Sequence, residues 1–223
     1  HTGTLYMTLA IFDLDNTLLG GDSDHAWGEF IADLGIVDGK SYREKNDAFY
    51  ADYCRGALDV FAYQRFVLQP LAGLGMAELA RWHAQFMREK IEPMILPKAQ
   101  ALVDSHRAQG HTLMIITATN AFITAPIAQR LGIDTLIATE PEQFNHTYTG
   151  NIVGVPCYRE GKVQRLNVWL AENNESLMGS YFYSDSHNDL PLLQLVDHPV
   201  AVDPDDILRK HAEDSGWQVL GLR

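Results

Sequence analysis

The sequence predicts an α/β protein: a mostly parallel sheet covered by helices on both faces, with a helical cap inserted after the first strand. Short apolar segments rich in Ile, Val, Thr and Tyr alternate with helix-like segments along most of the chain. Residues 20–97 depart from this rhythm and show helical periodicity alone. Because parallel strands need long crossover connections, the alternation is typical of a Rossmann-like sheet.

The first predicted strand, Leu9–Asp13, leads into an acidic pair formed by Asp13 and Asp15. Side chains two residues apart on a strand point the same way, so both carboxylates are expected to project together. Open α/β sheets bind their ligands at the carboxyl ends of the strands. Two adjacent carboxylates repel each other unless a cation or a shared proton intervenes, which suggests Mg²⁺, a cation that binds oxygen ligands.

The inserted segment 20–97 is predicted to be a helical cap, which leaves residues 7–19 and 98–223 for the core. Helix continuation is disfavoured at Pro93 and Pro97, so these residues mark the return of the chain to the core. Apolar side chains recur at helical spacing in the segment, clearly in its first part and less regularly in its second: Trp27, Phe30, Ile31 and Leu34, then Phe61, Tyr63, Phe66 and Val67.

The remaining elements follow in order. Helices are predicted over 98–109 and 127–131, since each apolar pattern stops at a glycine, Gly110 or Gly132. Alternating residues with glycines predict a small hairpin within 144–155. Four further strands are predicted: Thr112–Thr117, Thr135–Thr139, Ser180–Ser184 and Pro199–Val202.

Polar residues stand at the ends of these strands and at the start of a helix. Thr117 ends one strand, Lys162 begins a helix-like segment, and Asp185, Asn188 and Asp189 follow the strand Ser180–Ser184. Each has an ordinary structural explanation on its own. Threonine is a common strand residue, lysine a common solvated helix residue, and Asn or Asp a favoured residue at helix starts. Thr17 after the first strand can equally be a turn cap.

In this order, the motifs resemble those of the haloacid dehalogenase-like phosphohydrolases, most closely the branch that contains phosphoserine phosphatase (subfamily IB). The resemblance covers nearly the whole chain. It implies an Mg²⁺-dependent phosphoric monoester hydrolase that acts through an aspartyl-phosphate, with a helical cap over the active site. The motif residues are Asp13, Asp15, Thr17, Thr117, Lys162, Asp185, Asn188 and Asp189.

The resemblance also implies a role for each catalytic residue. Asp13 is expected to be the nucleophile, and Asp15 the acid that protonates the leaving oxygen and then deprotonates water. Thr117 is expected to donate a hydrogen bond to a phosphoryl oxygen, with Ala118 beside it in the substrate site. Lys162 is expected to neutralise charge on Asp13 and the phosphate.

The metal and phosphate ligands are implied in the same way. Mg²⁺ is expected to bind the carboxylates of Asp13 and Asp185 and the main-chain oxygen of Asp15. Asn188 is expected to orient the phosphoryl pocket, and Asp189 to support the site from behind.

The expected substrate is inferred from the segment that follows the nucleophile. Asp22 resembles the acidic position that contacts the substrate amine in phosphoserine phosphatases, and Arg55 is the candidate for a substrate carboxylate. Thr117 and Ala118 stand where those enzymes have Ser-Gly. The run 20–27 resembles a bacterial subgroup that contains histidinol-phosphate phosphatases, so histidinol phosphate, an intermediate of amino-acid biosynthesis, is the favoured substrate, with Asp22 and Asp24 as its partners.

Three alternatives stay open at this point. The substrate is phosphoserine, or the same aspartyl-phosphate passes its phosphoryl group to a second substrate, as in a phosphotransferase or mutase. In the third, Asp22 or Ser23 is simply the N-cap of a helix in a solvated hinge. The sequence leaves the oligomeric state open.

Composition limits the partners. A net charge of −12 argues against nucleic acid or an anionic membrane as the main partner, because both require basic surfaces. No apolar run approaches the roughly 20 residues that span a bilayer, and we expect a cytoplasmic protein that starts naturally at Met7 and acts on a small phosphorylated metabolite. Cys54 and Cys157 are isolated, and the histidines lack His-x-x-x-His spacing, so neither a zinc site nor a redox pair is expected.

Overall fold

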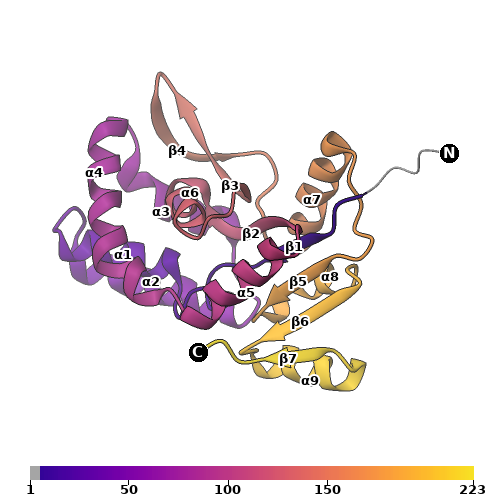
Figure 1. Cartoon of the computed structure of the whole chain (residues 1–223). Coiled ribbons are helices and arrows are strands. Elements are labelled where there is room, and N and C mark those ends of the chain that lie inside the picture. Colours follow the sequence, from indigo (N-terminus) through magenta and orange to yellow (C-terminus); the bar gives the residue numbers. More distant parts are fainter. Residues whose placement is uncertain (1–5) are drawn as a thin grey trace.

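The computed structural model describes residues 6–223, in which seven strands form one sheet in the order β4-β3-β2-β1-β5-β6-β7 (Figure 1). Neighbouring strands are parallel except β3 and β4, which are antiparallel. The predicted α/β class is confirmed. Residues 1–5, which precede the expected start at Met7, lie outside the described residues. The strands are β1 Leu9–Phe12, β2 Thr112–Asn120, β3 Thr135–Phe144, β4 Thr147–Val153, β5 Tyr181–Ser184, β6 His198–Val202 and β7 Gln218–Leu220.

Helices cover both faces of this sheet, and the alternating side chains of β1 pack against the helices on each face. All four β1 residues are fully buried, as expected for a central parallel strand. Ala10 and Phe12 pack into one apolar cluster, while Leu9 and Ile11 pack into a second cluster on the opposite face. The first cluster contains side chains of α5 Pro97–Ala108 and α6 Ala121–Arg130; the second contains side chains of α7 Glu160–Asn173, α8 Leu190–Leu193 and α9 Asp206–Ser215.

The part of the chain that connects β1 to α5 forms a group of helices. This group lies at one end of the molecule (Figure 1). Trp27, Phe30 and Ile31 are buried, and the Trp27 ring meets Phe86 edge-on at 5.1 Å, whereas Leu34 is exposed beyond the helix end. The division at 20 and 97 stays a prediction. The elements are α1 Ser23–Asp33, α2 Gly39–Cys54, α3 Val60–Leu68, the 3₁₀ turn η1 Gln69–Leu71, α4 Met76–Phe86, the π turn η2 Met87–Ile91 and the 3₁₀ turn η3 Glu92–Met94.

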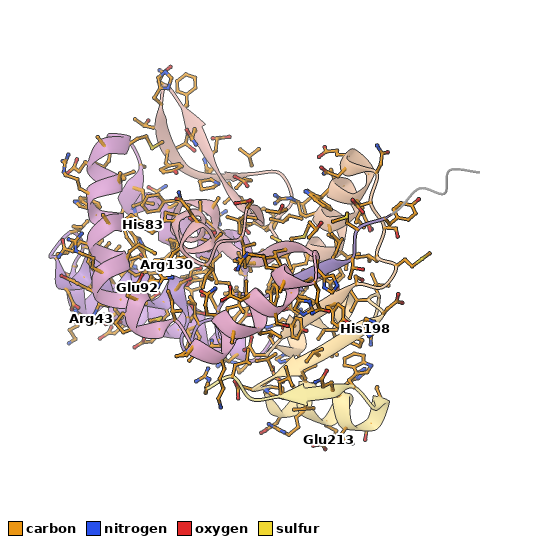
Figure 2. All side chains as sticks on the ribbon, in the orientation of Figure 1. Arg43, His83, Glu92, Arg130, His198 and Glu213 are labelled. Atoms are coloured by element: carbon orange, nitrogen blue, oxygen red, sulfur yellow. The ribbon has the colours of Figure 1, made fainter. Side chains whose placement is uncertain are left out.

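Two polar contacts tie these helices to the sheet-covering helix α6. The buried ring of His83 in α4 donates from Nε2 to the carbonyl of Ile123 at 2.8 Å. Glu92 in the returning segment accepts two hydrogen bonds from Arg130, at 2.6 and 3.1 Å (Figure 2). Both contacts hold α4 and η3 against α6. Within residues 6–223, no helix is both long enough and apolar enough to cross a bilayer.

Several predicted boundaries differ from the structure. The hairpin turn falls at Asn145 and His146, whose positive φ angles suit a two-residue turn, so its first strand precedes the predicted segment 144–155. β3 runs on past Thr139 because its second half leaves the parallel sheet and pairs with β4. The mostly polar sequence of α9, with only Leu208 and Ala212 buried, explains why the pattern did not reveal it.

A buried histidine of α5, His106, packs against side chains of β1 and β5. His106 Nε2 is 2.6 Å from the Tyr183 hydroxyl, and His106 Nδ1 is 2.8 Å from His111 Nδ1. Burial, with a smaller contribution from His111, lowers the pKa of His106 to about 4. The neutral imidazole is therefore the form that this network holds.

This network predicts an acid-labile contribution to stability. The unfolded chain binds a proton at His106 near pH 6.5 and the folded chain only near pH 4, so the free energy of unfolding should fall as pH drops from about 6.5 towards 4. Urea unfolding at about pH 7.5 and about pH 5 should show a smaller pH-dependent loss for His106→Gln than for the wild type. His146→Asn, at an exposed turn, is the control. An identical loss in wild type and His106→Gln would contradict the assignment.

Candidate active site

The carboxyl end of β1 places Asp13 at the centre of the sheet. The Asp13 amide donates to the carbonyl of Tyr183 in β5 at 2.9 Å, which extends the strand pairing by one residue. The chain then turns sharply, and the carbonyl of Leu14 accepts from the amides of Leu18 and Leu19. The turn leaves the buried Asp13 carboxylate at the edge where open α/β sheets bind ligands.

Lys162 is buried beside this carboxylate, with a side chain that is 2% exposed. Its Nζ lies 3.1 Å from Asp13 Oδ1 and 2.9 Å from Asp189 Oδ1. Burial alone would lower the lysine pKa, but the charges of Asp13 and Asp189 raise it overall, so the ammonium form is held. The solvated-helix explanation for Lys162 therefore does not apply.

Close packing at the start of α7 brings Lys162 inward. A Cβ atom at Gly161 would lie 2.1 Å from the carbonyl oxygen of Pro156, so only glycine fits at this position. The ammonium group of the next residue thereby reaches the end of β1, although the two residues are far apart in sequence.

Thr17 joins Asp13 to the second acidic motif. Its Oγ1 lies 2.9 Å from Asp185 Oδ1 and 3.3 Å from Asp13 Oδ2, and it accepts from the Asp185 amide at 3.1 Å. Burial and then the charge of Asp13 raise the pKa of Asp185 well above its usual value. The buried carboxylate of Asp13 and the partly buried one of Asp185 lie around one hydroxyl and form an all-oxygen donor set, which fits a hard divalent cation such as Mg²⁺.

The Asp15 side chain takes no part in this donor set. Its Oδ1 accepts from the Ser23 amide at 2.6 Å, and its Oδ2 accepts from the Thr119 hydroxyl at 2.7 Å. Burial and then the charge of Asp22 raise the pKa of Asp15 to about 7. A carboxyl group with this pKa can both give and take a proton near neutral pH, as a general acid–base requires.

The partner Thr119 was missed by the sequence reasoning, which stopped at Thr117. The two threonines are two residues apart on β2, and this spacing puts both side chains on one face. The same alternation that joins Asp13 to Asp15 could have indicated Thr119. The Thr119 amide also donates to the Thr117 hydroxyl oxygen at 3.2 Å.

A cavity opens above Asp13 and Asp15, between the strand ends and the helices α1, α2 and α3. Four aspartates line it, and none of its lining residues is Lys, Arg or His. Burial raises the pKa of Asp22 to about 6 and that of Asp24 well above its usual value. A cationic ligand would relieve this concentration of acidic groups. The lining residues are Asp13, Asp15, Asp22, Asp24, Tyr50, Tyr53, Leu58, Val60, Tyr63, Gln64, Thr117, Ala118 and Thr119.

Two predicted substrate residues lie outside this lining. Arg55 is the C-cap of α2, and its side chain is 65% exposed and folds back to pair with Asp52. The guanidinium group of Arg55 therefore does not reach the cavity. Asn188 does reach α2, where its Nδ2 donates to the carbonyl of Tyr53 at 3.0 Å. Its Oδ1 accepts from Arg159 Nε at 3.2 Å, a contact that no sequence motif indicated.

A second group of potential metal ligands lies away from the strand ends. Among the described residues, His25, Glu29 and Asp47 bring ligand atoms within 4.8 Å of one another. His25 already pairs with Asp47 at 2.7 Å, and Arg43 holds Glu29 at 3.0 Å. The sequence spacing did not reveal this group because its members come from two different helices.

Comparisons with known sequences agree with this geometry. A family model described as haloacid dehalogenase-like hydrolase matches residues 10–194. A protein named histidinol-phosphatase from Neisseria meningitidis is 48% identical over 219 residues, which cover 96% of this chain and 99% of that protein. A phosphoserine phosphatase of Mycobacterium tuberculosis is 32% identical over 220 residues, covering 96% of this chain and 70% of that protein.

Two solved structures are similar over almost the whole chain. A protein of unknown function from Bordetella pertussis Tohama I matches with a TM-score of 0.92 and 45% identity, covering 98% of this chain and 100% of that one. A substrate-bound phosphoserine phosphatase matches with a TM-score of 0.71 and 14% identity, covering 98% and 94%. At that identity, the second likeness shows the fold alone.

Proposed function

Because the chain belongs to the haloacid dehalogenase-like hydrolase family and is a phosphatase, we propose that it hydrolyses histidinol phosphate through a phosphoryl-Asp13 intermediate with the help of Mg²⁺. The relative named histidinol-phosphatase supports this substrate, since it is similar over nearly its full length. The lining of the cavity selects the substrate, because a shared fold does not fix one.

The observation that carries the proposal is the charge of the cavity. Asp22 and Asp24 line it beyond Asp13 and Asp15, and no basic side chain lines it. Histidinol phosphate offers an ammonium group and an imidazole and has no carboxylate. Phosphoserine would bring a carboxylate next to these aspartates, and juxtaposed like charges cost several kcal/mol. The cavity therefore favours the amino alcohol phosphate.

The proposed chemistry uses two carboxyl groups in turn. An oxygen of Asp13 forms a bond to phosphorus while the bond from phosphorus to the alcohol oxygen breaks, and Asp15 gives its proton to that oxygen. Asp15 then takes a proton from water, whose oxygen attacks the phosphoryl group and frees Asp13. This order of steps uses the carboxyl group whose pKa is near 7 as the proton carrier.

The remaining residues supply charge and orientation. In this proposal Lys162 neutralises Asp13 and the phosphoryl group, and the hydroxyl of Thr117, which lines the cavity, donates to a phosphoryl oxygen. Asp13, Asp185 and the main-chain oxygen of Asp15 would hold Mg²⁺. When bound, the cation offsets negative charge on the phosphoryl oxygens.

Replacing Asp22 tests the substrate assignment. Asp22→Asn should lower kcat/KM for histidinol phosphate at least about tenfold more than for p-nitrophenyl phosphate, which has no amine, because a charge-assisted hydrogen bond is lost. Asn is as good an N-cap as Asp, so α1 should keep its start.

Asp38→Asn is the matched control for this experiment. Asp38 caps α2 as Asp22 caps α1, but it lies outside the cavity lining. Its substitution should leave the ratio of the two substrates unchanged. Equal losses for both substrates in Asp22→Asn would contradict a role in amine binding.

A further inference from the structure

We propose that Gln64 and Asp24 form an acceptor pair that recognises a ring N–H at the end of the substrate remote from the phosphate. The inference rests on the proposed function and deepens it. It narrows the substrate class to phosphorylated amino alcohols that also carry a planar nitrogen heterocycle, and it names the residues that select the ring.

Gln64 provides a fixed hydrogen-bond acceptor. It lies in α3, is 2% exposed and lines the cavity. Its Nε2 donates to the carbonyl of Ala118 at 3.2 Å, and because a carbonyl only accepts, this contact fixes which end of the amide faces β2. Thr139 donates to the same carbonyl at 2.8 Å. The amide oxygen of Gln64 is left buried without a partner.

Asp24 provides a second acceptor in the same cavity. It lies in the first turn of α1, is 5% exposed, and its Oδ1 is buried without a hydrogen-bond partner. Buried polar atoms in native proteins are almost always partnered. Two unpartnered acceptors that line one cavity therefore indicate a ligand that brings hydrogen-bond donors to it.

Asp22 and Asp24 divide the acidic lining beyond Asp13 and Asp15. The proposed function assigns Asp22, the N-cap of α1, to the amine, which lies two carbons from the phosphate oxygen, and one oxygen of Asp22 already accepts from the His25 amide at 2.8 Å. Asp24 and the Gln64 oxygen remain for the group beyond the amine.

The side chains that line the cavity have the chemistry to contact a flat ring, and its walls must move apart to admit one because the free volume is about 30 Å³. The tyrosine rings of residues 50, 53 and 63 line it, together with Leu58 and Val60. Aromatic faces attract cationic and planar groups, and the aliphatic side chains exclude water from around them. An imidazole offers a flat face and one N–H donor, or two when it is protonated, while an aliphatic amine offers no face.

The test compares two substrates that share the amine and the phosphate but differ in the ring. Histidinol phosphate carries the imidazole, and O-phosphoethanolamine has the same spacing of amine and phosphate without it. The measured quantity is the ratio of their kcat/KM values. Gln64→Met should lower this ratio about tenfold or more, mainly through a higher KM for histidinol phosphate, because the contact is remote from the reacting atoms. Asp24→Asn should lower it in the same direction.

Gln100→Met is the matched control. Gln100 in α5 also has a buried, unpartnered amide oxygen, but it lies outside the cavity lining, so its substitution should leave the ratio unchanged. If Gln64→Met fails to fold, as judged by thermal melting, the Asp24→Asn ratio decides.

The outcomes separate the two proposals. A ratio in Gln64→Met and Asp24→Asn equal to that of the wild type overturns the inference and leaves the proposed function intact. A wild-type enzyme that does not turn over histidinol phosphate overturns the proposed function and the inference with it. If the variants lose the same factor in kcat/KM for both substrates, Gln64 only positions the backbone at Ala118, and this result also overturns the inference.

Discussion

Asp13→Asn should lower kcat for phosphate release by at least about four orders of magnitude, since an amide cannot act as the nucleophile that forms the phosphoryl intermediate. The fold should persist because Asn has nearly the same shape and Lys162 keeps its pair with Asp189 at 2.9 Å. Loss of one of the two carboxylates around Thr17 also removes the repulsion that Asp185 experiences. Thermal unfolding of the variant should therefore match or exceed that of the wild type.

Asp134→Asn, an exposed aspartate between α6 and β3, controls for the general effect of removing a negative charge. Its kcat should equal that of the wild type. Phosphate release by Asp13→Asn within about tenfold of the wild type would exclude Asp13 as the nucleophile.

Lys162→Met should destabilise the protein by about 3–5 kcal/mol and abolish most activity, because it leaves two buried carboxylates without their cation. Urea unfolding measures the first effect and phosphate release the second. The double variant with Asp189→Asn should regain part of the stability, since one unpaired charge is removed, and none of the activity.

Lys210→Met is the control, because Lys210 pairs with Asp214 on the exposed face of α9. Exposed pairs contribute about 1 kcal/mol or less, so this variant should differ little from the wild type. A destabilisation of Lys162→Met no larger than that of Lys210→Met would show that the buried ion pairs do not hold the site together.

The central strand and its acids could be predicted from sequence because their signals are local. β1 is a continuous apolar run, and the spacing of Asp13 and Asp15 follows directly from strand geometry. Lys162 and Asp185 could be placed only through the order of the motifs. Their contacts with Asp13 and Thr17 depend on how distant strands and helices meet.

The contacts that α2 and α3 make with the site could not be predicted because they arise from packing between segments far apart in the chain. Gln64 reaches Ala118 across 54 residues, and Asn188 reaches Tyr53 across 135. Arg55 was expected at the substrate, yet the end of α2 directs its side chain to Asp52 at the surface. The positive charge of an arginine does not by itself indicate where its side chain points.

The proposed substrate and mechanism can be tested together by measuring kcat/KM for histidinol phosphate and for phosphoserine side by side, with and without Mg²⁺, and with Asp13→Asn as the blank. We expect Mg²⁺-dependent release of phosphate with a preference for histidinol phosphate of about 100-fold or more, since phosphoserine places a carboxylate beside Asp22 and Asp24. A preference for phosphoserine would rule out histidinol phosphate as the favoured substrate, and activity that survives thorough removal of the metal would rule out the role of Mg²⁺.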